Sequence, residues 1–474
     1  MFPSLDRLTL LYNFGRSLRS TAYVYRPTHV EQIVELFQLA LRHEFTIGFR
    51  GAGRSYGDAS LNGGHIVLDL GRMNQILAWN PETGVIKVEP GVTIQDLWMH
   101  ILEDGWWPRV VPGTMFPTLG GCLGMNIHGK NNFVAGPIGE HVLEFTALLP
   151  TGESITCTPT HHGDLFHAMI SGVGVLGVFT SITLQMKRIY SGDLWVHAWA
   201  SPSLRQMMAE MEPLKADSDY LVGWVDGTWG GRGALGRGQV HRAHYLKPGE
   251  DATPTLSLQP DHQNLPDTFL GLVPKSILYQ FMRPFMNNAG TWLVNTGKYI
   301  ASRTYSHRKT YLQSLVAFNF LLDYVPNWEK SYGRGGLIQY QSFIPRETAA
   351  DAFCEILTLS QKRGLPTYLG VLKRHRPDKF LLSHAVDGYS LAMDFKVTDG
   401  NRQALQKLTY ELNDVVLPAG GRFYFAKDSM LTARAVARSL GEETLACFRQ
   451  FKDRCDPGHL LQTELYRRLF SKNS

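Results

Sequence analysis

Residues 49–64, FRGAGRSYGDASLNGG, place five glycines among arginine, tyrosine, serine and aspartate side chains. Consecutive backbone amides bent through glycines form a concave nest that binds anions such as phosphate. Gly51, Gly53 and Gly57 are spaced G-x-G-x-x-x-G, and the loop runs into a strand-like segment, so it fits neither a Rossmann turn nor a Walker loop. The residues predict a phosphate-binding loop of another kind, with a plain surface turn between strands as the alternative.

A second glycine-rich element, VPGTMFPTLGGCLGMNIHGKNN, covers residues 111–132. Thr118 is placed to cap a short helix that carries Gly120, Gly121 and Gly124, so that a phosphate could lie close to its backbone. His128 and Lys130 follow directly, and His128 is either a ligand-facing group or an ordinary core imidazole. We expect the two glycine-rich elements to hold one ligand together.

Residues 172–177, GVGVLG, fit the pattern G-x-G-x-x-G. They follow a helix-like run and precede a strand-like one, which is the reverse of the order that a dinucleotide fingerprint needs. We interpret them as a tight glycine turn beside a bound ligand.

The elements that must position these loops alternate between helix and strand. Helical spacing of apolar residues covers 28–44, where Thr28 and Glu31 suggest a capping box, and a second helix ends at Gly105. Strand-like runs occur at 45–49, 65–70, 84–91, 144–153 and 177–189. This is an α+β pattern rather than a doubly wound one. We expect a first domain over 1–195, a second over 196–420, and a C-terminal segment over 421–474.

Bulk composition narrows the class of protein. The chain has 474 residues and a formal net charge of +5 with no basic arm, which argues against nucleic acid and is compatible with a small anionic ligand. Five scattered cysteines predict neither a disulfide framework nor a zinc site and favour a reducing compartment. No signal peptide or membrane span is expected. Residues 269–294 are the most membrane-like, and we favour a buried or interdomain helix pair there over a membrane-surface patch.

Four stretches carry a family resemblance: RGAGRSYGD, VPGTMFPTLGGCLGMNIHGKN, GVGVLGVFTSITL and CDPGHLLQTELYRRL. They resemble the vanillyl-alcohol-oxidase-type (PCMH-type) family of FAD oxidoreductases, over nearly the whole chain. The stretches GRSYGD, IHGKN, SYGRGGLIQYQSFIP, GVLKR and GGRFYFAKDS are similar, in the same order, to the branch of that family that oxidises polyprenyl-phosphoryl ribose. The resemblance implies a two-domain α+β fold in which a substrate (cap) domain is built on an antiparallel sheet, and in which the C-terminal segment returns to the FAD-binding domain.

The resemblance also implies where FAD binds. The positions that match cofactor contacts are Arg50, Gly51, Ala52, Gly53, Arg54, Ser55, Tyr56, Gly57, Asp58, Gly113, Thr118, Gly120, Gly121, Asn126, Ile127, His128, Val178 and Tyr424. Many relatives bind the flavin covalently through a histidine in the first loop. Here that region holds Arg54, and His65 is poorly placed, so the resemblance implies non-covalent FAD.

Lys427 stands where the ribose oxidases keep an active-site lysine, and Tyr56 is the second candidate for the catalytic base; the residues leave the choice open. Other substrate-facing positions are Lys130, Tyr332, Gln339, Gln341 and Lys373. Gln339 and Gln341 are two apart, so on a strand they point the same way. Lys373, beside two arginines, has a solvated face as its alternative. Ala392 stands where relatives often keep a cysteine, which leaves the substrate less certain than the chemistry.

The resemblance implies oxidation of a secondary sugar hydroxyl, with polyprenyl-phosphoryl-β-D-ribose converted to its 2-keto form in the first half of an epimerisation that supplies cell-envelope arabinose. A short-chain reductase would complete that epimerisation. Such a substrate would place the chain in the cytoplasm, in peripheral contact with the membrane. The alternatives are an FAD oxidase or dehydrogenase of a free alditol or aldonolactone, a binding protein without catalysis, and a chain that binds no flavin.

Overall fold

A small mixed sheet at the N-terminus carries the first glycine loop. The computed structural model describes residues 3–231, 233–269 and 273–471. The strand order in this sheet is β1–β2–β4–β3, with β1 (Leu8–Tyr12), β2 (Arg19–Tyr25), β3 (Ile47–Arg50) and β4 (Ile66–Asp69). Strands β3 and β4 are parallel, and residues 51–65 connect them, so the loop begins where a buried strand ends.

Helix α1 (Val30–Arg42) joins β2 to β3 and buries Ile33, Phe37 and Ala40, which recur at helical spacing. The predicted Thr28–Glu31 capping box is wrong, because the helix begins one residue later. His29 is the N-cap residue, and the Thr28 backbone N–H donates to the Gln32 side chain at 2.8 Å.

A five-stranded antiparallel sheet supports the second glycine element and the 172–177 turn. Its order is β5–β6–β10–β8–β9, with β5 (Ile76–Asn80), β6 (Val85–Val88), β8 (Val142–Leu148), β9 (Ser154–Cys157) and β10 (Val178–Gln185). The short strands β7 (Trp106–Trp107) and β11 (Lys187–Arg188) pair beside it. The helices of this region are α2 (Ile94–Ile101), α3 (Leu119–Gly124), α4 (Asn132–Ala135) and α5 (Gly163–Met169).

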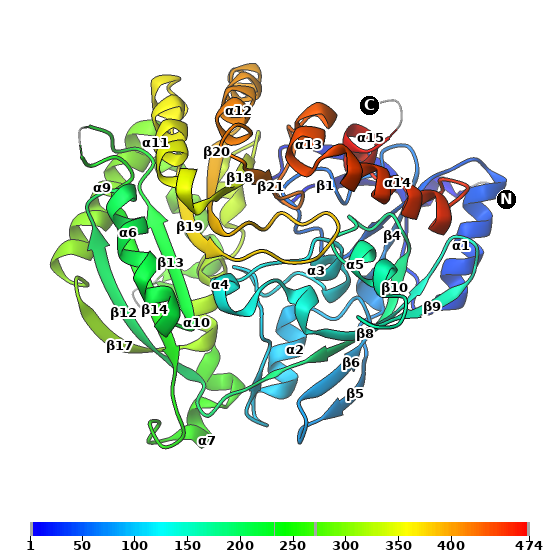
Figure 1. Ribbon diagram of the computed structural model, residues 1–474, viewed down its shortest axis with the longest axis horizontal. Helices are drawn as coiled ribbons and strands as arrows, with labels where there is room; N and C mark the ends of the chain where they lie inside the picture. The colour runs from blue at the N-terminus through cyan, green and yellow to red at the C-terminus, as the bar shows by residue number, and fades with distance from the viewer. Residues whose placement is uncertain (1–2, 232, 270–272, 472–474) are drawn as a thin grey trace.

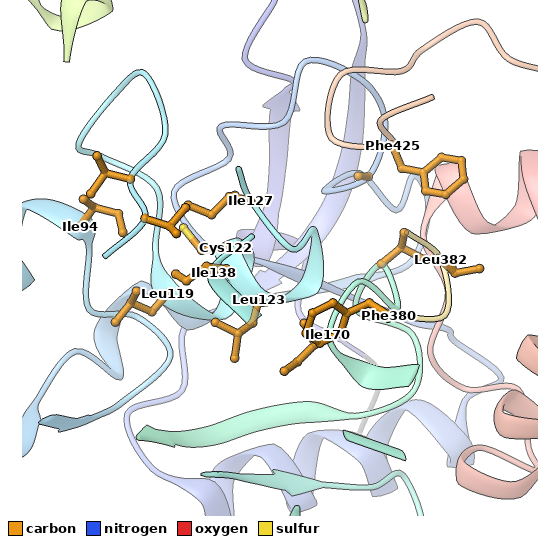
Figure 2. Packing of buried hydrophobic residues seen from close by; sticks show 14 of the residues in the cluster. Ile94, Leu119, Cys122, Leu123, Ile127, Ile138, Ile170, Phe380, Leu382 and Phe425 are labelled. Atoms are coloured by element: carbon orange, nitrogen blue, oxygen red, sulfur yellow. The ribbon is translucent and has the colours of Figure 1, made fainter. Parts of the chain in front are cut away.

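Helix α3 is fixed by an apolar core on several sides. Thr118 is its N-cap residue, as predicted, although its side chain donates and accepts no capping bond. Figure 2 shows Leu119, Cys122 and Leu123 of α3 among apolar side chains from other segments, with Phe380 near Ile170 and Phe425 from the C-terminal segment. Burial of these side chains fixes the backbone of the second glycine element against both halves of the molecule.

The second half of the chain is organised around an eight-stranded antiparallel sheet, which fits the α+β expectation. Its order is β17–β12–β14–β13–β19–β20–β18–β21, with β12 (Asp193–Ser201), β13 (Tyr220–Val225), β14 (Gly238–Tyr245), β17 (Lys309–Ser314), β18 (Leu337–Pro345), β19 (Leu369–His375), β20 (Gly388–Lys396) and β21 (Arg422–Phe423). Helices α6 (Leu204–Leu214), α11 (Arg346–Lys362) and α12 (Arg402–Val416) pack on it (Figure 1). The predicted boundary at 195/196 falls inside β12, and the one at 420/421 falls just before β21; the division into domains stays a prediction.

The C-terminal helices return to the N-terminal sheet. These are α13 (Ala433–Leu440), α14 (Glu442–Cys455) and α15 (Glu464–Leu469), drawn in red beside the blue N-terminal elements in Figure 1. The Ile47 N–H donates to the Leu460 carbonyl, and the Gln462 N–H donates back to the Ile47 carbonyl, each at 2.8 Å. The last described residues therefore complete the edge of the sheet that carries the first glycine loop.

Residues 269–294 were predicted to form a buried or interdomain helix pair; two helices are present, but they are not buried. They include α8 (Lys275–Met282) and the start of α9 (Asn288–Thr304), while residues 270–272 lie outside the described part of the chain. Phe281 is 57% exposed and Leu293 is 57% exposed. The expectation of burial failed because an apolar run looks the same in sequence whether or not another element covers it.

The remaining elements are short. They are α7 (Pro254–Ser257), α10 (Leu315–Asn319), the hairpin β15 (Thr268–Phe269) with β16 (Val273–Pro274), and the 3-10 helices η1 (Leu5–Arg7), η2 (Leu70–Arg72), η3 (Ile138–His141), η4 (Lys215–Asp217), η5 (Pro260–Gln263), η6 (Arg283–Phe285), η7 (Leu321–Tyr324) and η8 (Trp328–Tyr332). In the described ranges, no helix combines the length and the apolar character needed to cross a membrane.

Candidate active site

The predicted site residues gather around one cavity of about 730 Å³ between the glycine-rich loops and the eight-stranded sheet. Most of the predicted positions line it: Arg50, Gly51, Ala52, Gly53, Arg54, Ser55, Tyr56, Gly113, Thr118, Gly120, Gly121, Ile127, His128, Lys130, Val178, Gln339, Gln341, Lys373, Tyr424 and Lys427. Gly174 and Gly177 of the third glycine motif also line it, as expected for a turn beside a ligand. Segments nearly 380 residues apart in the sequence therefore share one cavity.

The first glycine loop presents a row of free backbone donors to this cavity. None of the five backbone N–H groups from Gly51 to Ser55 donates a hydrogen bond to any residue in the described part of the chain. Only Gly53 of these five residues is buried, and the other four can also be reached by water. A run of five backbone donors without a protein partner on a cavity wall is a place where a ligand can accept hydrogen bonds. A chain of such donors is an anion nest.

Two glycines of this loop are required by close packing. A Cβ atom on Gly51 would lie 2.0 Å from the Thr118 hydroxyl oxygen, so Gly51 lets the first loop touch the second glycine element. Gly53 has φ of +63°, a conformation that L side chains rarely adopt, and a Cβ there would lie 2.1 Å from the Arg50 guanidinium. The Arg50 side chain donates to the Tyr12 carbonyl at 3.0 Å and to the Ser60 hydroxyl at 3.1 Å. Arg50 thus holds the shape of the loop.

Four predicted residues do not line the cavity. Asn126 accepts from the Gly139 N–H, and Tyr332 lies in an apolar cluster with Tyr56 and Trp328. Gly57 lets the loop pass the C-terminal segment, because a Cβ there would lie 1.5 Å from the Asp428 carbonyl oxygen. The fourth residue is Asp58.

Asp58 ties the first loop to the end of the chain. The Arg468 guanidinium donates to both Asp58 carboxylate oxygens at 2.7 and 2.8 Å, and it forms an ion pair with Asp428 at 2.9 Å. The Tyr56 N–H donates to the Ala426 carbonyl at 2.8 Å. These bonds fix Tyr56 and Lys427 relative to each other, since each lies one or two residues from an anchored position.

Lys427 and Tyr56 meet inside the cavity. The Lys427 Nζ atom lies 3.7 Å from the centre of the Tyr56 ring and has no hydrogen bond or ion pair with the described residues. Burial lowers the pKa of Lys427 to about 7, helped by the nearby Lys373 charge and opposed by Asp394. Burial raises the pKa of Tyr56 well above its ordinary value, and its hydroxyl has no partner among the described residues. Lys427 is thus the group that can be neutral near pH 7, while Tyr56 keeps its proton.

Asp394, which the sequence did not suggest, does not line the cavity but interacts with two residues that do, Gln339 and Lys427. It stands on β20 directly opposite Gln339 of β18, and the Gln339 amide donates to one of its carboxylate oxygens. The other oxygen has no partner in the described structure. Burial raises the pKa of Asp394 to about 7, although Gln339 and Lys427 both oppose the rise. The charge on Asp394 raises the pKa of Lys427, and the charge on Lys427 lowers the pKa of Asp394, so the protonation of each group affects the other.

The cavity wall is strongly cationic. Its lining within the described chain includes four cations without a hydrogen-bond or ion-pair partner, namely Arg54, Lys298, Lys373 and Lys427, and no Asp or Glu. Three of them contact aromatic rings instead: Arg54 lies over the rings of Phe14 and Phe116, Lys298 lies 4.1 Å from the Trp224 ring centre, and Lys427 lies over the Tyr56 ring. Burial lowers the pKa values of Lys298 and Lys373 to about 8. Unpaired cations in a confined space predict an anionic ligand.

The cations follow one another along the cavity. The charge of Lys373 lowers the pKa values of both Lys427 and Lys130, and the charges of Lys130 and Lys298 both lower that of His241. We call this row, Lys427–Lys373–Lys130–Lys298, the lysine row. Lys130 is partly engaged, because its Nζ donates to the Phe318 carbonyl. The sequence did not suggest Lys298, since it lies on a helix that no motif marked.

Gln341 and His128 meet across the cavity floor. The Gln341 amide donates to His128 Nε2 at 3.2 Å and to the Ser390 hydroxyl at 3.2 Å. Burial keeps the pKa of His128 well below its ordinary value, so this imidazole is neutral, and its Nδ1 has no partner among the described residues. His375, His384 and Tyr424 surround the ring of His128. The two predicted glutamines point the same way, and both are already bonded to protein.

Two further expectations concern single positions. His65 does not line the cavity, and its Nδ1 accepts from the Thr46 N–H at 3.1 Å. Ala392, where relatives often have a cysteine, does line it. In the described chain no group of three or more metal-ligating side chains is close enough to hold a metal ion, and all five cysteines are free thiols.

Comparison with known proteins shows similarity to FAD-binding oxidoreductases. Residues 21–158 match the family described as FAD binding domain. The chain is 31% identical over 440 residues to decaprenylphosphoryl-beta-D-ribose oxidase of Mycolicibacterium smegmatis, which covers 91% of each chain. It is 31% identical to a D-lactate dehydrogenase of Anaerostipes hadrus over 34% of its length, and 27% identical to the L-gulonolactone oxidase of Bos taurus over 34%. The last two similarities cover about a third of each relative.

Proposed function

The chain belongs to the family of FAD-dependent oxidoreductases that includes decaprenylphosphoryl-β-D-ribose oxidase, and from that premise we propose that it oxidises a polyprenyl-phosphoryl ribose to its 2-keto form. The similarity to that oxidase supports FAD-dependent sugar oxidation as the coarser activity. The finer proposal names the substrate, the base and the setting of the reaction. It depends on one observation above all: three of the four members of the lysine row, Lys427, Lys373 and Lys298, have no hydrogen-bond or ion-pair partner in the described chain, and the described lining of the cavity holds no carboxylate.

The residues present fit FAD. Its pyrophosphate needs donors in a confined bend, and the five free N–H groups of Gly51–Ser55 supply them beside the unpaired Arg54. Nothing in the loop offers a histidine for a covalent bond, and His65 is turned to Thr46, so we propose that FAD is held without a covalent link. When bound, FAD supplies the acceptor for the hydride that leaves the substrate carbon.

A phosphoryl sugar suits the lysine row better than a free sugar does. A neutral sugar would leave Lys298 and Lys373 without counter-charge in a cavity where burial already lowers their pKa values. A phosphoryl group near Lys130, Lys373 or Lys298 would pair with them and restore their charged form. The sugar would then extend toward Lys427 at the other end of the row.

Lys427 is the proposed base. Its lowered pKa lets a neutral Nζ accept the proton of the sugar hydroxyl near pH 7, while hydride leaves the same carbon. Tyr56 keeps its proton, so its free hydroxyl is suited to donate a hydrogen bond to the sugar oxygen. Asp394 sets the balance by holding up the pKa of Lys427. The proton thus moves from substrate oxygen to Lys427 Nζ.

The chemistry of the product indicates which enzyme would act next. A 2-keto sugar is the midpoint of an epimerisation, and a short-chain reductase that delivers hydride to the other face would complete it, in the supply of cell-envelope arabinose. A polyprenyl substrate lies in a membrane, so the proposed place of action is the cytoplasmic membrane face.

The deciding experiment compares substrates by whether each one reduces the bound flavin. Purified protein loaded with FAD is mixed anaerobically with polyprenyl-phosphoryl ribose in detergent, with L-gulonolactone, with D-lactate and with free alditols. Bleaching of the flavin absorbance by the phosphoryl ribose, with the 2-keto product identified by mass, would support the proposal. Bleaching only by a free sugar, lactone or hydroxy acid would replace it, and protein that stays colourless after FAD addition would remove it.

A further inference from the structure

Helix α9 has its polar and apolar faces reversed relative to an ordinary surface helix. Its buried residues are Thr291, Asn295 and Ser302, all polar, while Leu293 is 57% exposed and Ile300 is 55% exposed. At 100° per residue, Leu293 and Ile300 lie on the side opposite to the three buried residues. A surface helix of a soluble protein normally turns its apolar stripe to the core.

The inward polar face of α9 is fixed by specific bonds. The Asn295 amide donates to Asp226 at 3.2 Å, and the buried Arg237 donates to the Thr296 hydroxyl at 2.8 Å. Arg237 also forms an ion pair with Asp226 at 3.1 Å and lies 4.7 Å from the centre of the Tyr299 ring. These contacts hold the helix in this rotation, so the outward direction of Leu293 and Ile300 is built into the fold.

The neighbouring elements continue the exposed apolar surface. Helix α8 packs against η6 and η8, and η6 packs against α9. We call the exposed set on α8, η6 and α9 the α8–α9 surface, and its members are Ile277, Phe281, Phe285, Trp292, Leu293, Val294 and Ile300. Several exposed apolar side chains on elements that pack together are typical of an interaction site.

The stretch of sequence that forms this surface is basic. Residues 268–322 contain six of the chain's 47 basic residues and none of its 42 acidic ones. Arg283 and Arg303 lie on the same elements as the apolar set, and neither has an ion-pair partner in the described chain. Acidic residues near this segment are Asp267, which interacts with Lys275, and Glu329 of η8, which packs on α8, so basic residues outnumber acidic ones around the apolar set. Apolar and aromatic side chains with an excess of basic neighbours are typical of elements that lie in the interface of an anionic lipid bilayer.

The α8–α9 surface is continuous with the cavity. Lys298, between Leu293 and Ile300 in α9, ends the lysine row inside the cavity. Leu321 lines the cavity and is itself 49% exposed, so the cavity reaches the outside near this segment. One helix therefore carries both exposed apolar side chains and a lysine that lines the cavity where the cavity meets the surface.

We propose that the α8–α9 surface docks on an anionic phospholipid bilayer and sets the cavity opening at the level of the lipid headgroups. Phe281, Leu293 and Ile300 enter the headgroup boundary, and Arg283 and Arg303 pair with lipid phosphates. If the proposed function holds, a lipid-linked sugar phosphate would then reach Lys298 without leaving the membrane surface. The docking itself does not depend on it.

The test is vesicle flotation with the full-length FAD-loaded protein. Vesicles of phosphatidylglycerol and phosphatidylcholine in equal parts are compared with pure phosphatidylcholine at low salt. We expect flotation with the anionic vesicles only. The triple variant Phe281→Ser/Leu293→Ser/Ile300→Ser should lower the partition coefficient about tenfold or more, and Arg283→Gln and Arg303→Gln about fivefold each.

The matched control replaces three exposed leucines on other elements, Leu41→Ser/Leu77→Ser/Leu143→Ser, and should float like the native protein. Flavin content and thermal unfolding show that every variant is folded. Absence of flotation of the native protein, or equal flotation of both triple variants, would overturn the proposal. A concentration-dependent dimer that only the Phe281/Leu293/Ile300 variant loses, without vesicle binding, would assign the surface to a second copy. Because flotation uses no substrate, its outcome is separate from the turnover test of the proposed function.

Discussion

The Lys427 ammonium group lies 3.7 Å from the centre of the Tyr56 ring, at the meeting point of the first glycine loop and the C-terminal segment. An aromatic face attracts a cation, yet the pKa of Lys427 is still lowered to about 7, because burial costs the charged form more than the ring returns. The pair therefore combines a lysine that can lose its proton near pH 7 with a phenol that keeps its proton.

Replacement of Lys427 should remove the base and leave the cofactor. For Lys427→Met we expect turnover to fall about 100-fold or more, the usual contribution of a positioned base, with unchanged FAD content. Lys427→Arg should not restore it, since a guanidinium keeps its proton. Stopped-flow bleaching of the flavin measures the step directly. Native-like bleaching in either variant would show that Lys427 is not the base.

The pH profile should follow the neutral form of Lys427. Since its pKa is about 7, kcat/KM should rise with pH up to about 7 and level off above it. In Asp394→Asn the carboxylate that raises the pKa of Lys427 is gone, so the acid limb should move to lower pH, while the Gln339 bond can remain. Asp378→Asn, which alters a buried carboxyl outside the cavity, is the control. An acid limb that moves upward in Asp394→Asn would contradict this assignment.

Tyr56→Phe should separate activity from stability. The Tyr56 hydroxyl is buried without a partner in the described structure, so its removal relieves an unsatisfied group and should leave the melting temperature unchanged or higher. Turnover should fall about tenfold, roughly the 1.4 kcal/mol of one hydrogen bond to the reacting oxygen. Calorimetry and turnover on the same preparation check both. A variant that loses stability and keeps its activity would reverse the interpretation.

Acid precipitation should release the flavin. With Arg54 in the first loop and His65 bonded to Thr46, we expect all flavin absorbance in the supernatant after trichloroacetic acid. Mass spectrometry of the intact denatured chain gives an independent reading, with no added mass of FAD. Yellow colour that stays with the pellet would contradict non-covalent binding.

The Arg468 side chain should contribute much more to the free energy of unfolding than an ordinary surface arginine does. Arg468→Met leaves Asp58 and Asp428, each with a side chain only 8% exposed, without their shared cation. We expect the free energy of unfolding to fall by about 3 kcal/mol, as when one partner of a buried ion pair is removed. Arg454→Met breaks an ion pair with Asp164 whose side chains are 55% exposed, and should cost about 0.5 kcal/mol. Urea titrations of both variants make the comparison, and similar losses would show that the Arg468 contacts are weak.

Local sequence signals predicted the local parts of the site. Gly51, Gly53 and Thr118 could be singled out because turn chemistry and helix caps depend on neighbours in the chain, and the structure brings all three to the cavity. The order of elements around 172–177 excluded a Rossmann turn and left a turn beside a ligand, where Gly174 and Gly177 lie.

What the sequence did not reveal depends on pairing between distant segments. Asp394 enters the site because β18 and β20 pair in a register that sets it opposite Gln339, and register between strands 55 residues apart is not written in either strand alone. Lys298 is one of many lysines until α9 is seen packed on β12 and β14. The outward direction of Phe281 and Leu293 likewise depends on what covers them, which composition does not give.

The clasp that Arg468 makes between Asp58 and Asp428 has a consequence for how the protein is made. Synthesis delivers the first glycine loop early and Lys427 some 370 residues later, and Arg468, which contacts both segments, arrives later still. The lining of the cavity is therefore complete only after residues up to Lys427 have been synthesised, and the ion pairs that fix it form only after Arg468 has been added.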